Sequence, residues 1–334
     1  MPLVSFCFTT YKRPDILIDT VKSVLLQSFT DFEVIISDND PEQSGKKITE
    51  VIKDSRVKYF PNEENLGMKK SFNKSLERSV GEYIVMIADD DPVYPNMLET
   101  LINLKEKYPG YGLYTGACNW FCTNVAIAKL FNIKVGTNSF LAEQDVDTVS
   151  VYDANEFLVN FFNFKILPNY LWSTAMVKRS ILIEKGGVPD YNTAFLGDYA
   201  YLSIMASHSG CVVINRALGH QTIHNENFGR AQNDQIKTAC VNFVEYVSQR
   251  INHLKDWQLI EATMKRFVAL WAFAHMSFLY NYYKKNASSE LKSFQVAEKE
   301  VFAVPFIKPY RIKYLLKTKY PAFHDLVVRI KKRL

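Results

Sequence analysis

The stretch Tyr83-Ile-Val-Met-Ile-Ala-Asp-Asp-Asp91 joins a run of mostly apolar residues to three consecutive carboxylates. The apolar part is typical of a buried β-strand. Three adjacent carboxylates repel one another unless a cation lies among them. Taken alone, the triplet could equally be a solvated acidic turn that caps a helix near Pro95. Its position directly after a buried strand favours a metal site.

Strand and helix patterns alternate on both sides of this stretch. Predicted strands span residues 3–9, 32–36, 57–60 and 83–88, and predicted helices span residues 16–26, 48–52, 68–80 and 95–108. This alternation predicts an α/β fold with a doubly wound, mostly parallel sheet and right-handed crossovers. Ligands of such sheets bind beyond the carboxyl ends of the strands. Polar residues follow all four strands, so we expect a ligand site on that rim.

The pattern after residue 110 is less regular. Residues 110–140 contain short β-like segments, and residues 231–283 are compatible with helix almost throughout. Between them we predict helices at 153–162, 179–185 and 194–207, an extended segment at 171–177 and a strand at 211–214. We therefore divide the chain into an α/β domain, 1–230, and a helical C-terminal region, 231–334. Within the domain, residues 1–110 form the regular half and residues 111–230 the less regular half.

Positive charge is concentrated at the C-terminus. The net charge is +5, but residues 305–334 hold nine Lys or Arg and one acid, so that segment carries +8 and the rest −3. The main body is therefore not a nucleic-acid-binding surface. After Pro321, apolar residues recur at helical spacing among basic ones, which favours a helix on an anionic membrane surface. A solvated helix packed on the domain 1–230 is the alternative.

The cysteines and the hydrophobic runs indicate the compartment. Five scattered cysteines, with no spacing typical of a zinc site, favour free thiols in a reducing cytoplasm. The first residues form a strand pattern rather than a signal peptide, and no apolar run reaches the length of a membrane span. We expect a cytoplasmic protein that lies peripherally on the inner face of the membrane. The oligomeric state stays open.

Four motifs in register resemble the family 2 glycosyltransferases of the GT-A fold. They are FTTYKR at 8–13, IISDND at 35–40, NLG at 65–67 with Asn73, and DDD at 89–91 followed by Pro95. With later elements, the resemblance covers roughly the first 230 residues. It implies that this domain is catalytic, with 1–110 as the nucleotide-sugar-binding half and 111–230 as the acceptor half. It implies an enzyme that uses Mn²⁺ or Mg²⁺ to transfer a sugar from a nucleotide-sugar to a glycan or lipid-linked acceptor. Synthesis of a bacterial surface polysaccharide is the implied setting.

The resemblance also implies which residues bind the donor. Thr9, Tyr11 and Asp38 would form the pocket for the nucleotide base. Because a carboxylate only accepts hydrogen bonds, Asp38 would select the N3–H of uracil or thymine against cytosine, giving a UDP- or dTDP-sugar. Arg13 and Lys69 or Lys70 would meet the diphosphate or ribose, although a solvated helix face explains the two lysines equally well. The implied donor-binding residues are Thr9, Tyr11, Arg13, Asp38, Asn65, Gly67, Lys69 and Asp89.

The implied metal ligand is Asp90, with Asp91 and His224 as further candidates. The common family pattern has an Asp two residues before the metal ligand, where this chain has Ala88, and this leaves the division of labour among the three aspartates open. His220 is a weaker candidate than His224. The polar segment 225–235 is predicted to be a mobile lid over the bound donor.

Asp198 is the implied general base for the acceptor hydroxyl, in a single displacement with inversion. Most family members have Glu before this Asp, and here that position is Gly197. Without the family context, Asp198 would be interpreted as a helix N-cap. Trp172 is a candidate for stacking on a sugar, with a core role as the alternative.

Two other functions are weighed against sugar transfer. A nucleotidyltransferase would need a Gly-rich phosphate loop early in the chain, and none occurs between Thr9 and Asp19. A nucleotide-sugar-binding protein without activity is supported only by Ala88 and Gly197. Sugar transfer is the function that the sequence favours.

Overall fold

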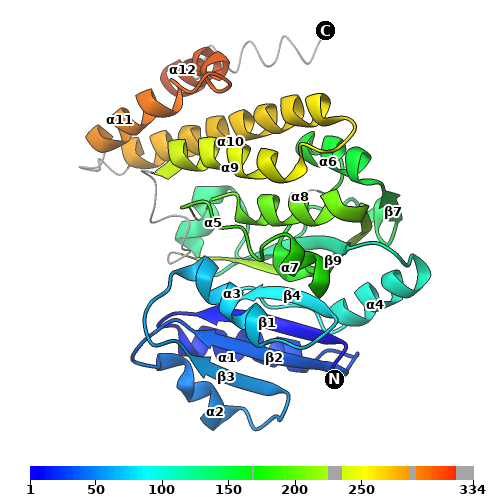
Figure 1. The fold of residues 1–334 in the computed structure, drawn as a ribbon. Coiled ribbons are helices and arrows are strands. Elements are labelled where there is room, and N and C mark those ends of the chain that lie inside the picture. Colours follow the sequence, from blue (N-terminus) through cyan, green and yellow to red (C-terminus); the bar gives the residue numbers. More distant parts are fainter. Residues whose placement is uncertain (168, 194, 225–234, 286–290, 321–334) are drawn as a thin grey trace. The chain divides into compact units, whose positions relative to one another are not determined.

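The structure is a computed structural model that describes the chain except residues 168, 194, 225–234, 286–290 and 321–334 (Figure 1). The chain divides into two compact units. The first comprises Met1–Asp190, Gly197–Asn225 and His253–Lys255, and the second comprises Tyr191–Leu196, Glu226–Asn252 and Asp256–Leu334. The predicted boundary between residues 230 and 231 lies outside the described residues.

The first half of the first unit alternates strands and helices as predicted. Strands β1, β2 and β4 form its centre, with β1 paired in parallel to β2 on one side and β4 on the other, and β3 parallel to β2. Helix α1 begins at Pro14, a position where proline's missing N–H costs nothing. The bounds are β1 Val4–Thr10, α1 Pro14–Leu25, β2 Phe32–Asp38, η1 Ser44–Lys47, α2 Ile48–Val51, β3 Val57–Pro61, α3 Met68–Arg78, β4 Tyr83–Ala88 and α4 Met97–Lys107.

The sheet continues through the second half with mixed strand directions. Its order is β3-β2-β1-β4-β8-β5-β9-β7, and β6 pairs with β5. Strand β8 is antiparallel to β4 and β5, whereas β5 and β9 are parallel. The bounds are β5 Leu113–Cys122, α5 Val125–Phe131, β6 Gly136–Asn138, η2 Glu143–Asp145, β7 Val149–Tyr152, α6 Ala154–Phe162, η3 Trp172–Thr174, β8 Ala175–Lys178, α7 Arg179–Glu184, α8 Gly197–Ser209 and β9 Cys211–Ile223. The predicted fold class, α/β with a mostly parallel sheet, is confirmed.

The second half contains the main differences from the predicted elements. Residues 113–122 form one strand of 10 residues instead of several short segments, and β9 has 13 residues, far more than the predicted 211–214. The predicted extended segment 171–177 forms a strand only from Ala175, and that strand, β8, ends at Lys178, one residue beyond the prediction. The earlier residues Trp172–Thr174 form a 3₁₀ turn instead. Strand β9, paired with β5 along its length, extends as far as the acidic triplet, where Thr222 contacts Asp91.

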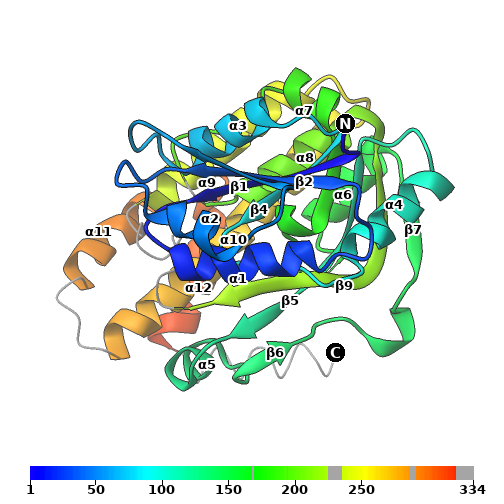
Figure 2. The same ribbon diagram turned by 90° about the horizontal axis from the view of Figure 1, so that it is seen from below.

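The alternation of side chains along β1 gives each face of the sheet its own partner helix. Val4, Phe6 and Phe8 enter a fully buried hydrophobic cluster with Leu17 and Val21 of α1. Thr9 points to the other face, where its hydroxyl hydrogen-bonds to Ser71 of α3. Figure 2 shows α1 and α3 on opposite sides of β1 and β2. The helices therefore hold the strand ends in place from both faces.

The second unit is helical. It contains α9 Ile236–Ile251, α10 Trp257–Lys285, α11 Leu291–Val301, η6 Lys308–Tyr310 and α12 Arg311–Lys319. Helix α10 packs against α9, α11 and α12, so the helix-compatible segment 231–283 includes two described helices rather than one. None of the helices within the described ranges is long and apolar enough to cross a membrane. The tail helix predicted after Pro321 lies outside the described residues.

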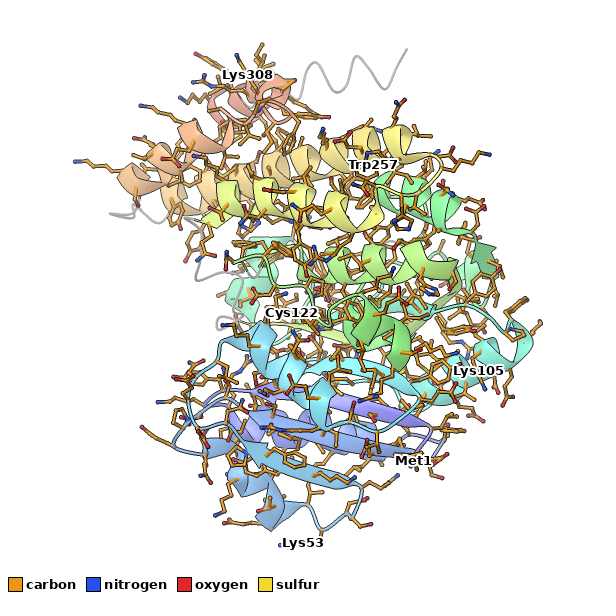
Figure 3. The ribbon with its side chains drawn as sticks, viewed as in Figure 1. Met1, Lys53, Lys105, Cys122, Trp257 and Lys308 are labelled. Carbon is orange, nitrogen blue, oxygen red and sulfur yellow. The ribbon has the colours of Figure 1, made fainter. Side chains whose placement is uncertain are left out.

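All five cysteines are buried free thiols. Cys122, labelled in Figure 3, is the last residue of β5. This agrees with the absence of disulfide spacing in the sequence.

Candidate active site

The carboxyl ends of β1, β2 and β4 meet on one rim of the first unit. Thr10 is in register with Asp38 of β2, and Thr9 with Ala88, the last residue of β4. The backbone N–H of Asn39 donates to the carbonyl of Thr10 at 2.8 Å. The residues that follow these three strands are therefore neighbours, as the predicted sheet requires.

Arg13 and His224 hold two of the three consecutive aspartates. The Arg13 guanidinium forms ion pairs with both Asp89 and Asp90, the latter at 2.9 Å. The His224 Nε2 atom lies 3.0 Å from Asp90 Oδ2, and the Thr10 hydroxyl donates to Asp89 at 2.8 Å. His224, a candidate metal ligand, thus lies beside Asp90, the implied ligand, and its coordination of a metal stays a prediction.

Asp91 has a hydrogen-bond partner of its own in β9. Its Oδ1 atom accepts a hydrogen bond from the backbone N–H of Thr222 in β9 at 3.1 Å. Because β9 is much longer than predicted, it supplies both Thr222 and, one residue beyond its end, His224. The three aspartates therefore have different surroundings.

These surroundings separate the acidities of the three groups. Burial raises the pKa of Asp89, and Arg13 only partly opposes it. Burial would also raise the pKa of Asp90, but the His224 hydrogen bond and the charge of Arg13 outweigh it and lower that pKa. Burial and the neighbouring charge of Asp90 raise the pKa of Asp91 well above its ordinary value. Asp90 is thus the carboxylate most strongly held in the ionised form.

The donor atoms near Asp90 fit a divalent cation that shares its coordination with phosphates. No group of three or more His, Cys, Asp or Glu among the described residues converges on a metal position. Asp90 and His224 offer one carboxylate and one imidazole within 3.0 Å of each other. Mg²⁺ and Mn²⁺ commonly take one or two protein ligands and complete their shell with water and substrate phosphates. The fit therefore needs the donor diphosphate, and it needs Arg13 to yield part of its contact with Asp90.

Asp38, predicted to recognise the nucleotide base, is fully buried. Its Oδ2 atom accepts from the Gly45 N–H at 2.8 Å and the Tyr59 hydroxyl at 2.7 Å, and its Oδ1 atom accepts from the Asp40 N–H at 3.0 Å. A carboxylate has about four acceptor positions, so one at Oδ1 is left for a base. A Cβ at Gly45 would lie 2.8 Å from Oδ2, which explains a glycine at this position.

The two other residues of the predicted base pocket differ in exposure. Tyr11 is 43% exposed, so its ring is accessible to a base. Thr9 is buried, and its hydroxyl is hydrogen-bonded to Ser71. The Thr9 hydroxyl is therefore already hydrogen-bonded within the fold, and the part of Thr9 in a base pocket stays a prediction.

Asn65 and Gly67 join the loop before α3 to the loop after β2. Asn65 Oδ1 accepts from the Asn39 side chain at 2.6 Å and from the Gly67 N–H at 2.9 Å. Gly67 has φ +79°, a conformation that side chains disfavour, and it leads directly into α3. These contacts position the loop, and a direct contact of either residue with the donor stays a prediction.

Asp198 is the second residue of α8 and is half-buried. Its Oδ1 atom accepts a hydrogen bond from the backbone N–H of Trp172 at 2.9 Å. Burial raises the pKa of Asp198, and the Trp172 N–H and the charge of Lys69 oppose that rise. The carboxylate thus belongs to the same unit as the acidic triplet but is carried by helix α8, whereas the triplet follows strand β4.

Asn73, which belongs to the third of the four motifs, holds the backbone at Val188, ten residues before Asp198. Its side chain accepts from the Val188 N–H at 2.7 Å and donates to the Val188 carbonyl at 3.3 Å. Gly187 has φ +80°, and a Cβ there would overlap the Asn73 side chain. The Gly186-Gly187 pair is therefore required for this contact as well as for ending α7.

Two aromatic and imidazole candidates have structural partners. Trp172 is buried and packs edge-on against Phe72 at 5.0 Å, so the core alternative describes it. His220 Nε2 hydrogen-bonds to the Tyr94 hydroxyl at 2.8 Å, and Asn119 donates to the same hydroxyl. The predicted lid falls on residues 225–235, of which all but Gln235 lie outside the described residues.

Lys69 lies at a position that sequence reasoning did not foresee. Its side chain is buried, and its Nζ atom has no hydrogen-bond partner among the described residues. The ammonium lies 4.9 Å from the Trp172 ring centroid, beside Gly197. The prediction that Lys69 meets the diphosphate or ribose stays a prediction.

A parallel first half of the sheet, an antiparallel strand beside it, and carboxylates on the rim together define a GT-A glycosyltransferase architecture. The family model for glycosyl transferase family 2 matches residues 5–184. The chain belongs to this family, and the resemblance seen in its four motifs is confirmed.

Curated relatives match the first part of the chain. A GalNAc(5)-diNAcBac-PP-undecaprenol beta-1,3-glucosyltransferase of Campylobacter jejuni is 31% identical over 121 residues, which cover 35% of this chain and 38% of the relative. A putative colanic acid biosynthesis glycosyl transferase, WcaA of Escherichia coli, is 34% identical over 109 residues, covering 32% and 39%. The matches thus span about two fifths of these relatives' own lengths.

Solved structures share the fold over almost the whole chain. TarS of S. aureus, residues 1–349 in complex with UDP-GlcNAc, superposes with a TM-score of 0.60 at 15% identity, covering 91% of this chain and 82% of TarS. The mannosyltransferase PcManGT of Pyrobaculum calidifontis, in complex with GDP-Man and Mn²⁺, gives a TM-score of 0.54 at 13% identity, covering 97% and 88%. At these identities the likeness establishes the fold alone.

Proposed function

We propose that the protein transfers a sugar, with inversion, from a nucleotide-sugar to a hydroxyl of a glycan or lipid-linked acceptor. The observation that carries the proposal is the placement, in one unit, of an ionised Asp90 with its His224 contact and a half-buried Asp198 at the start of helix α8. One group faces a departing diphosphate and the other an attacking hydroxyl. Membership in the glycosyltransferase family supports this division.

Each residue has a chemical task in this reaction. Asp90 and His224 would hold Mn²⁺ or Mg²⁺, which when bound supplies Lewis-acid stabilisation of the leaving nucleoside diphosphate. Arg13 donates to the phosphate oxygens once it has left Asp90. Asp198 accepts the proton of the acceptor hydroxyl as that oxygen attacks the anomeric carbon from the face opposite the leaving group. Asp89 and Thr10 orient Arg13 and the ribose side of the rim.

The proposed donor is a UDP- or dTDP-sugar. Asp38 Oδ1 accepts one hydrogen bond within the fold, and its second acceptor position suits the N3–H of uracil or thymine, whereas the N3 of cytosine is itself an acceptor and cannot donate to it. The structure of TarS with UDP-GlcNAc supports a uracil nucleotide, and PcManGT with GDP-Man and Mn²⁺ supports the divalent metal. We expect calorimetric titration in the presence of Mn²⁺ to show UDP or dTDP binding more tightly than CDP. Tighter binding of CDP than of both others would refute the role of Asp38.

The proposed acceptor belongs to bacterial surface polysaccharide synthesis. The Campylobacter jejuni relative is named for an undecaprenol-diphosphate-linked glycan, and the Escherichia coli relative for colanic acid. A putative teichuronic acid glycosyltransferase of Bacillus subtilis, 36% identical over 100 residues, points to the same setting. A lipid-linked acceptor would place the enzyme peripherally on the inner face of the membrane.

Replacement of Asp198 tests the function directly. Asp198→Asn keeps the shape and the hydrogen bond from Trp172 but cannot take up a proton. We expect transfer from the donor to fall by about 10³-fold or more, since general-base catalysis contributes 10² to 10⁴, while nucleotide binding is retained. Turnover near that of the unchanged enzyme would remove Asp198 from the role. Donor binding without metal-dependent transfer in the unchanged protein would instead support a binding protein.

A further inference from the structure

The Lys69 ammonium occupies space that a side chain at residue 197 would need. Lys69 projects from α3, and an ideal Cβ built on Gly197 would overlap its Nζ atom. Gly197 is the first residue of α8, directly before Asp198. The glycine therefore admits the lysine to the immediate surroundings of the proposed base. The two positions are far apart in sequence, and only the fold brings them together.

The buried ammonium is stabilised by nearby carboxylates rather than by hydrogen bonds. Its Nζ atom has no hydrogen-bond partner among the described residues and lies 4.9 Å from the centroid of the Trp172 ring. Burial lowers the pKa of Lys69 to about 8, and the charges of Asp198 and Asp190 oppose that decrease. Burying a charge costs a great deal unless an opposite charge compensates it. Asp198, which is half-buried, also gains from a counter-ion.

The charges around Asp198 come from several elements. The titratable groups that face Asp198 or its lysine are Lys69 of α3, Asp91 after β4, Cys118 of β5, Asp190, and Tyr199 of α8. Among these described groups Lys69 is the only cation. The others are acids, so their ionised forms would disfavour the anionic form of Asp198.

Two other tasks for the lysine fit less well. A subsite for an anionic sugar substituent would place that anion beside Asp198 and Asp190, which would repel it. A contact with the donor diphosphate would require the ammonium to leave its fully buried position and reach the rim, where Arg13 already meets Asp89 and Asp90. The position beside Gly197 instead points to Asp198.

We propose that Lys69 is a positioning residue: its ammonium, admitted by Gly197, is the counter-ion that keeps the half-buried Asp198 carboxylate ionised and ready to take the acceptor proton. This proposal rests on the proposed function of Asp198. Without the lysine charge, the neutral form of Asp198 gains, and the pKa of Asp198 rises further above its ordinary value. The base is then protonated over more of the neutral pH range.

The pH dependence of transfer tests this role. We compare Lys69→Met, which keeps the length and loses the charge, with Lys74→Met on the same helix, where the Lys74 ammonium pairs with Glu77. kcat/KM is measured from about pH 5 to about pH 9, and UDP and Mn²⁺ affinities are measured by calorimetry. We expect the acid limb of Lys69→Met to move up by about one pH unit, the size of effect that one neighbouring charge produces. Lys74→Met should keep the original profile, and both variants should keep the original affinities.

Gly197→Ala supplies a second test that leaves the lysine charge in place. The new methyl group displaces the ammonium, so the acid limb should move in the same direction by a smaller amount. In the Lys69→Met background, Gly197→Ala should add little, because the two changes act through one contact. If Lys69→Met does not fold, as thermal denaturation would show, Gly197→Ala alone decides the question.

The remaining outcomes separate this proposal from the proposed function. An unmoved acid limb in Lys69→Met, or in a folded Gly197→Ala when Lys69→Met cannot be obtained, overturns the counter-ion role. An unmoved limb with weakened UDP binding assigns Lys69 to the diphosphate instead. A fully active Asp198→Asn enzyme, in contrast, would remove the base itself and with it the proposed function.

Discussion

Arg13 links the two aspartates that face the proposed diphosphate site. Its guanidinium pairs with Asp89 and Asp90 together, and Asp90 also contacts His224. A cation bound at Asp90 would therefore meet a positive charge already in place. The same guanidinium is free to bind phosphate once the metal holds Asp90. Arg13 would then exchange a protein carboxylate for the donor phosphates as the complex forms.

This exchange predicts opposite effects of Arg13→Gln on metal and nucleotide. Loss of the guanidinium removes a charge that competes for Asp90, so Mn²⁺ should bind the nucleotide-free protein about fivefold more tightly, equivalent to ~1 kcal/mol. UDP should bind more weakly because a charge-assisted phosphate contact is lost. Calorimetry or Mn²⁺ electron paramagnetic resonance gives both affinities. Lys12→Gln is the control, because the Lys12 side chain is exposed and its ammonium pairs with the Glu42 carboxylate at 3.9 Å. Equal Mn²⁺ affinity in Arg13→Gln and the unchanged protein would contradict the competition.

Among the secondary-structure elements, the first four strands could be predicted well and the later ones could not. Strands β1 and β2 are buried along their whole length, so their sequences are mostly apolar, and each ends in polar residues, Thr9-Thr10 and Ser37-Asp38. Strand β5 has register shifts at Gly116/Ala117 and Ala117/Asn119, which break the alternation on which a prediction depends. The second half of β9 includes half-buried polar residues such as Arg216 and Gln221, which resemble a loop.

The candidate site follows the same division. The acidic triplet and Arg13 are local to strand ends, so their position on the rim could be predicted from order along the chain. Their different surroundings could not, because Thr222 and His224 come from the unpredicted part of β9. The contact between Lys69 and Gly197 joins α3 to the start of α8, and no periodicity in either segment indicates it. Sequence thus identifies the groups, whereas tertiary packing sets their charge states.

For the whole molecule, the uneven charge recurs in the structure of the second unit. Residues 302–320 contain no acidic residue, and the exposed basic side chains there are Lys308, Arg311, Lys313 and Lys319. Lys308 is labelled in Figure 3. Ile312 and Tyr320 are 72% and 63% exposed among them. Basic and apolar groups together are typical of a surface that lies on anionic lipid. These exposed residues would therefore contribute to the predicted membrane contact, which stays a prediction.

Neutralising this basic segment should release the protein from anionic membranes. Deleting residues 305–334 would also remove the buried Ile307 and Tyr314, so the better variant replaces Lys308, Arg311, Lys313 and Lys319 by Gln. At about 1 kcal/mol for each basic residue near the surface, the loss of four should weaken binding by about 10³-fold.

Co-sedimentation with phosphatidylcholine vesicles containing phosphatidylglycerol measures this binding, and vesicles of phosphatidylcholine alone should bind neither form. The control removes the same charge from the first unit, at the exposed Lys46, Lys53, Lys107 and Lys129. Equal losses in both variants would mean that total charge, rather than the basic segment around α12, attracts the protein to the vesicles, and unchanged binding in both would refute the electrostatic anchor.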